Sequence, residues 1–142
     1  MAPHSTSLRC DRSELVRLTE LVDRFGVERG MSEDDLTNVR LVLDEIVSNV
    51  IRHGHTADGD GRVDVSLALD GHELKIDVTD NGIAFDPLAR PAPNLSLPIE
   101  QRPIGGLGIY IVKTLAETIA YRREDGQNHL SLTMRVGEQT DL

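Results

Sequence analysis

The chain has 142 residues and a formal net charge of −9, from 15 Lys plus Arg against 24 Asp plus Glu. This length predicts a single domain, because domains commonly contain roughly 100–200 residues. The acidic balance argues against a protein that binds nucleic acid or an anionic membrane surface, since both need a basic face. The single cysteine, Cys10, excludes an internal disulfide framework and a zinc site built from cysteines. With neither a signal peptide nor an apolar span in the sequence, we expect a cytoplasmic protein.

The first half of the chain predicts a strand, two helices and a hairpin. Residues 5–10 form an expected edge strand, and apolar residues at helical spacing predict a helix from about Ser13. A second helix is expected over 32–54, with acidic residues in its first turn, where the helix dipole favours them. Two alternating strands then surround the turn at Asp70-Gly71, a typical hairpin signal.

The second half predicts a long loop, a helix and two closing strands. Five of the six prolines fall within residues 83–104, a loop length that is usually functional or disordered. A glycine-rich segment at 105–108 opens a helix that is expected to reach about Ala120. Strands follow near 120–123 and 129–136. This order predicts an α+β fold, a two-layer sandwich with helices over a mixed, mainly antiparallel sheet.

The second predicted helix carries Glu45, Asn49 and His53 at intervals of four residues. A helical wheel turns all three away from the apolar face. A carboxylate there can accept a proton from a hydroxyl group, and an amide oxygen can bind Mg²⁺. Taken alone, the same pattern also fits a solvated helix face.

The second candidate feature is Asp80-Asn81-Gly82, at the end of a predicted strand. A carboxylate there can accept a hydrogen bond from an exocyclic amine such as that of adenine, and Gly82 lets a flat ring approach the backbone. A plain turn is the simpler interpretation of these three residues.

The third feature is the segment Gly105-Gly106-Leu107-Gly108 at the start of a helix. Free N–H groups and the helix dipole make such a terminus an anion site. It is not a Rossmann fingerprint, because no strand precedes it, and it is not a Walker loop, because no Gly-Lys-Ser/Thr follows. A flexible hinge is the alternative interpretation.

In combination, these motifs resemble those of the GHKL, or histidine-kinase-like, ATPases. Residues 41–54 resemble the N box, 80–87 the first glycine box, 105–117 the second glycine box and 128–134 the closing strand. The resemblance covers nearly the whole chain and implies one ATPase domain with the Bergerat-type fold over residues 1–142. Within the superfamily, the size and motif forms most resemble anti-sigma-factor serine kinases of the partner-switching type.

The resemblance implies a role for each motif residue. Asp80 would bind the adenine amine, Gly82 would pass beside the ring, and Asn49 would bind the Mg²⁺ that bridges the phosphates of ATP. Glu45 would be the general base that deprotonates a protein serine. The phosphates would be held at the glycine-rich helix start, by Gly105, Gly106, Leu107, Gly108 and Ile109.

The remaining assignments concern the loop and the closing strand. Residues 83–104 would form a lid over ATP, with Arg102 as a candidate cation for the γ-phosphate; a surface charge is the alternative for this arginine. Ser131 would help to fix the adenine through hydrogen bonds that include Asp80, and Thr133 is the alternative residue for this role. The family pattern often has a second glycine where this chain has Ala84, which puts lid motion in more doubt than nucleotide binding.

The resemblance also implies partners. Such kinases hold a sigma factor inactive and phosphorylate a STAS-domain antagonist on serine. A non-catalytic ATP-binding module that occludes a partner is the alternative function. Since family members often dimerise through the N-terminal strand and helix, a homodimer is expected as well.

Overall fold

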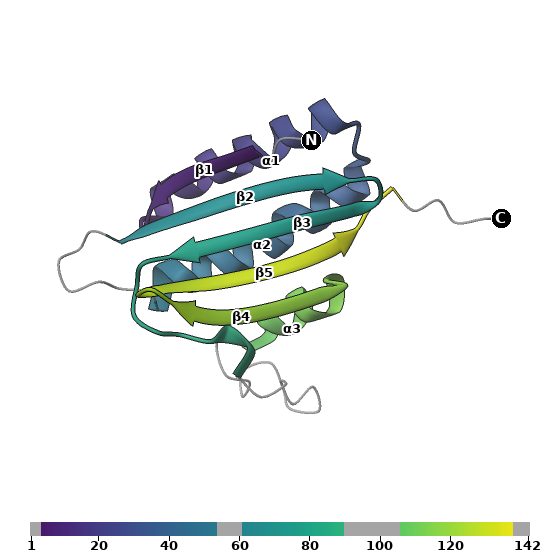
Figure 1. Ribbon diagram of the computed structural model, residues 1–142. Helices are drawn as coiled ribbons and strands as arrows, with labels where there is room; N and C mark the ends of the chain where they lie inside the picture. The colour runs from purple at the N-terminus through teal and green to yellow at the C-terminus, as the bar shows by residue number, and fades with distance from the viewer. Residues whose placement is uncertain (1–3, 54–60, 90–105, 138–142) are drawn as a thin grey trace.

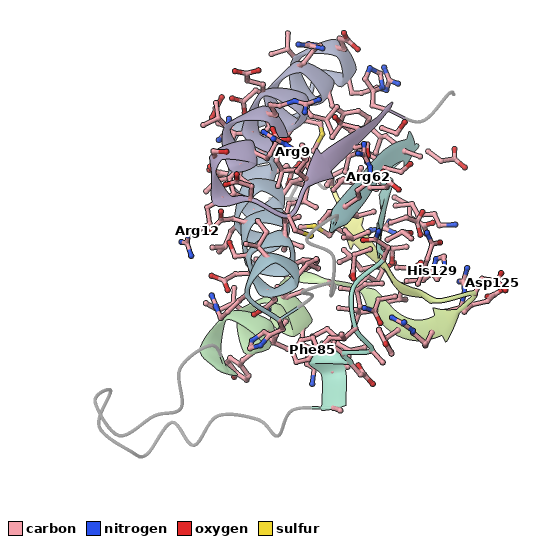
Figure 2. The ribbon with its side chains drawn as sticks, turned by 90° about the vertical axis from the view of Figure 1, so that its left-hand side faces the viewer. Arg9, Arg12, Arg62, Phe85, Asp125 and His129 are labelled. Atoms are coloured by element: carbon pink, nitrogen blue, oxygen red, sulfur yellow. The ribbon has the colours of Figure 1, made fainter. Side chains whose placement is uncertain are left out.

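The computed structural model describes residues 4–53, 61–89 and 106–137, which form three helices packed on one face of a five-stranded sheet (Figure 1). Figure 2 shows the two layers edge-on, with the helices on one side and the strands on the other. The expected α+β two-layer class is confirmed. The sheet is not mixed, however, because every strand pair is antiparallel. Among the described residues, no helix is both long and apolar enough to cross a membrane.

The first half of the chain follows the predicted order. Gly30 ends the first helix in the left-handed conformation, at φ 68°, and the Ser32 hydroxyl accepts a hydrogen bond from Asp35 N at 3.1 Å to begin the second. The elements are β1 (His4–Arg9), a 3₁₀ helix η1 (Arg12–Glu14), α1 (Leu15–Arg29), α2 (Glu33–His53), β2 (Arg62–Asp70) and β3 (Glu73–Asp80).

The second half contains a short 3₁₀ helix η2 (Pro87–Ala89), α3 (Gly106–Leu115), β4 (Thr118–Glu124) and β5 (Gln127–Arg135). The prediction that the last helix extends to about Ala120 is wrong, and Ile119 belongs to β4. Glu117 N donates to Thr133 O at 2.7 Å, so the chain has already joined the sheet two residues after the helix ends.

The strand order β1-β2-β3-β5-β4 puts β3 at the centre of the sheet. Its alternate residues Leu74, Ile76 and Val78 face the helices and are buried. Because β3 is central, the site at its end, at Asp80, has β2 on one side and β5 on the other.

We predict that Ile76→Ala lowers the free energy of unfolding by about 2–5 kcal/mol, because it leaves a cavity at a position with 0% exposure in the central strand. The neighbouring Lys75 is exposed, so Lys75→Ala should change stability by no more than about 0.5 kcal/mol. Urea denaturation of both variants tests this. Equal losses in the two variants would contradict the proposed packing of β3.

Candidate functional site

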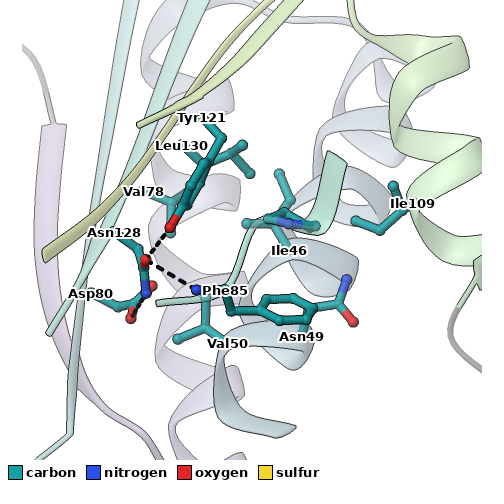
Figure 3. A pocket seen from close by; sticks show the side chains of 11 residues that line it. Ile46, Asn49, Val50, Val78, Asp80, Phe85, Ile109, Tyr121, Asn128 and Leu130 are labelled. Carbon is teal, nitrogen blue, oxygen red and sulfur yellow. Dashed lines mark hydrogen bonds between the residues drawn. The ribbon is translucent and has the colours of Figure 1, made fainter. Parts of the chain in front are cut away.

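A small pocket opens at the end of β3, between α2, α3 and the last two strands (Figure 3). Its walls are aliphatic and aromatic, with three polar side chains, Asn49, Asp80 and Asn128, all buried. The free volume between these walls is about 30 Å³. An apolar pocket with a few converging polar groups is the usual form of a small-molecule site.

Asp80 lies at the base of this pocket with 6% of its surface exposed. Its Oδ1 accepts hydrogen bonds from Gly82 N at 2.9 Å and from Asn128 Nδ2 at 3.0 Å. Its Oδ2 accepts no hydrogen bond from the described residues. One oxygen therefore orients the carboxylate and the other is available to a donor on a ligand.

The charge of Asp80 also acts on Cys10. Burial raises the pKa of the Cys10 thiol, and the nearby Asp80 carboxylate raises that pKa further. The thiol is therefore held in its protonated form at neutral pH, which makes it a poor nucleophile.

Asn128 connects the pocket to its surroundings, and the sequence analysis missed it. Its Nδ2 also donates to Ile83 O at 2.8 Å, and its Oδ1 accepts from Tyr121 Oη and from Phe85 N. Strand alternation could have found this residue, because Asn128 lies on the same face of β5 as the buried Leu130.

The predicted contribution of Ser131 to the Asp80 network is wrong. Ser131 lies on the opposite face of β5, and its hydroxyl donates to Asp77 Oδ1 at 2.6 Å. Thr133, the rival position, shares that outer face and pairs with Thr118. Figure 2 shows His129, two residues from Ser131, pointing away from the helices.

Glu45 lies against the first turn of α3. A Cβ atom at Gly108 would overlap its Oε2, so the two helices approach this closely only because residue 108 is a glycine. The carboxylate is thus held near the positive end of the α3 dipole. A phosphate group would favour the same position.

Asn49 has 4% of its surface exposed, so the interpretation of this helix side as a solvated face is wrong for this residue. Its Oδ1 accepts a hydrogen bond from Arg52 Nη1 at 3.3 Å, while its Nδ2 is buried and has no partner among the described residues. His53, one turn further, stacks on Phe85 with 4.6 Å between ring centroids.

The metal site implied by the resemblance would have few ligands from the protein. In the described parts of the chain, no three His, Cys, Asp or Glu side chains group to hold a metal ion. Mg²⁺ commonly takes one or two protein oxygens and completes its shell with phosphates and water. Asn49 can supply one such oxygen at the pocket edge.

The other predicted residues divide between described and undescribed segments. Ile109 lines the pocket with 3% exposure. Gly106 and Leu107 form the first turn of α3. Arg102, Gly105 and the 90–104 part of the predicted lid lie outside the described residues.

A wider hollow of about 450 Å³ lies at the other end of the sheet, beside the β2–β3 turn. Its polar groups join parts of the chain to one another: Gly137 N donates to Asp35 Oδ2 at 2.8 Å, and His72 Nδ1 bonds Val136 O at 3.0 Å. None of the predicted motif residues lines it. The pocket at Asp80 is therefore the stronger candidate.

Comparison with known proteins agrees with this choice. A family model described as a histidine kinase-like ATPase domain matches residues 9–134. The chain is 30% identical over 93 residues to the serine/threonine-protein kinase BtrW of Bordetella bronchiseptica, covering 66% of each chain. It is 29% identical over 116 residues to the serine-protein kinase RsbW of Bacillus thuringiensis, covering 79% of this chain and 72% of that one. These matches confirm the resemblance predicted from the motifs.

Two solved structures share the fold. One contains the RsbU and RsbW domains of Rv1364c from Mycobacterium tuberculosis, with a TM-score of 0.69 and 18% identity over 96% of this chain and 33% of that one. The other is the catalytic domain of the histidine kinase ThkA, with a TM-score of 0.53 and 16% identity. The match covers 93% of this chain and 95% of that one. At these identities the likeness concerns the fold alone.

We predict that Gly108→Ala costs more stability in the wild-type chain than in a Glu45→Ala background. In the wild type the new Cβ must displace the carboxylate, whereas without Glu45 the alanine only gains helix propensity. The difference should be about 0.5–3 kcal/mol, measured as a double-mutant cycle in urea. Additive effects would show that the two residues do not touch.

Proposed function

The chain belongs to the family of histidine kinase-like ATPase domains, and we propose that it is an ATP-dependent protein-serine kinase. Its substrate would be a STAS-domain antagonist of an anti-sigma factor, and its second partner a sigma factor that it sequesters. The observation that carries the proposal is the buried Asp80 carboxylate, with one oxygen fixed and the other accepting no hydrogen bond from the described part of the chain. The relatives named as serine kinases support the same activity.

ATP would lie along the pocket, with its base at Asp80 and its phosphates at the start of α3. The adenine amine would donate to Asp80 Oδ2, and Gly82, the next residue but one, would lie beside the ring. The main-chain N–H groups at the start of α3 would bind phosphate oxygens. Mg²⁺, when bound, would neutralise phosphate charge, with Asn49 as its protein ligand.

Glu45 would act at the phosphate end of this site. It lies against Gly108, in the first turn of α3, where the γ-phosphate is expected. The serine hydroxyl of the partner would attack the γ-phosphorus while the bond to the ADP oxygen breaks, and its proton would pass to Glu45. Arg102 stays a candidate for the γ-phosphate contact.

Partner binding would follow the nucleotide state, because ligands that favour different partners shift one equilibrium. A homodimer would use the N-terminal region, where β1 forms one edge of the sheet. We place this switch in the cytoplasm. The alternative function, a module that binds ATP without transferring phosphate, has the same pocket and differs only in the role of Glu45.

We predict that Asp80→Asn weakens ATP binding about 5-fold to 150-fold, because an amide replaces an acceptor that a buried amine needs, at a cost of about 1–3 kcal/mol. Asp77→Asn is the matched control, since Asp77 lies on the outer face of the same strand. Isothermal titration calorimetry with ATP and Mg²⁺ measures both. If Asp80→Asn bound ATP with the dissociation constant of the wild type, Asp80 would not be the residue that binds the adenine amine.

We predict that Glu45→Gln binds ATP normally and transfers no phosphate to serine. Glutamine keeps the size of the side chain beside Gly108 but cannot take the proton. The test is a pull-down from the source cells with Mg-ATP, followed by mass spectrometry for phosphoserine on co-purified proteins. Asp44→Asn, at an exposed neighbour, serves as the control.

Two outcomes would change the conclusion. Phosphorylation of a STAS protein at the wild-type rate by Glu45→Gln would remove Glu45 from the role of base. ATP binding by the wild type with a captured partner but no phosphoserine would favour the non-catalytic module.

A further inference from the structure

We propose that the ring of Phe85 occupies the base subsite of the nucleotide-free chain, so that ATP binds only by displacing it from His53. This inference rests on the proposed function, because it takes the pocket at Asp80 as the place of the adenine. It assigns to Phe85 a role in setting nucleotide affinity.

The position of Phe85 supports this assignment. In the view of Figure 3 its ring is seen between the side chains of Asp80 and Asn49, and all three residues line the pocket. It stacks on His53, from the last turn of α2, with 4.6 Å between centroids and 19° between ring planes. Because the ring lines the same pocket as Asp80 and Ile109 of α3, a ligand that joins Asp80 to the start of α3 would meet it.

The volume of the pocket leads to the same conclusion. With Phe85 in place, the free space is about 30 Å³. A cavity of that size holds a few water molecules at most, because one water needs roughly 10–15 Å³. A purine ring cannot enter until a wall residue moves. Of the residues that line the pocket, Phe85 lies outside the helices and strands and is half-buried.

The main chain around Phe85 is anchored, so the movement can be confined to its side chain. Asn128 holds Ile83 O and Phe85 N, and Pro87, two residues beyond, is buried. Rotation of the Phe85 side chain would free the pocket and separate the two stacked rings. Because the free chain must give up this stack, the observed affinity is lower than that of an already open pocket.

The test is the dissociation constant of the intact chain for ATP with Mg²⁺. Phe85→Ala should bind ATP about two-fold to ten-fold more tightly, the factor that corresponds to one aromatic stack. His53→Ala should also bind more tightly, by a smaller factor. The double variant should gain no more than Phe85→Ala alone, because both changes remove the same contact. Leu41→Ala, an exposed apolar truncation on α2, is the control and should leave the constant unchanged.

A second measurement observes the ring itself. The chain has two phenylalanines, Phe85 and the core residue Phe25, so 4-fluorophenylalanine labelling gives two ¹⁹F signals. Phe85→Leu assigns them. Saturating ATP should move the Phe85 signal towards that of a solvent-exposed ring and leave the Phe25 signal in place.

The outcomes separate this inference from the proposed function. Weaker ATP binding by Phe85→Ala, with an unchanged melting temperature, would mean that the ring stacks on the base and would overturn the inference alone. So would a Phe85 signal that stays in place at saturating ATP. Failure of both the wild type and Phe85→Ala to bind ATP would overturn the proposed function together with the inference.

Discussion

The hydrogen bond between Asn128 and Asp80 is the interaction on which the site depends. The Asn128 side chain makes four hydrogen bonds, two through Nδ2 and two through Oδ1, which is its full capacity. These bonds join the end of β3, the segment that follows it and β4. A buried amide whose donors and acceptor are all paired favours one arrangement of the groups around it. It therefore fixes Asp80 Oδ1, while Oδ2 accepts no hydrogen bond from the described residues.

The contact between α2 and α3 fixes the other end of the pocket. Gly108 allows the Glu45 carboxylate to lie against the first turn of α3, where the helix dipole stabilises negative charge. Phosphate would bring more negative charge to the same turn. A cation near Asn49 would offset that repulsion, so the proposed metal ion and the proposed phosphate site would support each other electrostatically.

The sequence predicts the elements well because each has its own local signal. Alternation marks the β2–β3 hairpin, and helical spacing with Ser32 and Gly30 marks α1 and α2. The end of α3 is predicted wrongly because Ile119 fits both the helical spacing from Leu115 and the strand alternation with Tyr121. Only the tertiary bond from Glu117 N to Thr133 O decides between them.

The site is predicted less completely, because its geometry depends on register and on neighbouring layers. The motif resemblance selects Ser131. Because alternate residues of β5 face opposite sides of the sheet, however, Asn128 lies in the pocket and Ser131 on the outer face. A helical wheel treats α2 as having one buried face. Asn49 is buried because α2 also packs against α3, which no local pattern of α2 can show.

Two polar atoms of the pocket at Asp80 support it as the binding site we favour. Burying an unpaired polar atom costs about 1–3 kcal/mol, so stability alone does not favour it. Asn49 Nδ2 is such an atom, and Asp80 Oδ2 also has no partner among the described residues. Both atoms belong to residues that line one largely apolar pocket, which the Phe85 ring also lines. An apolar ring keeps the walls packed but satisfies neither group. A ligand with a flat base, a donor at one end and anionic oxygens at the other would satisfy Asp80 Oδ2 and Asn49 together.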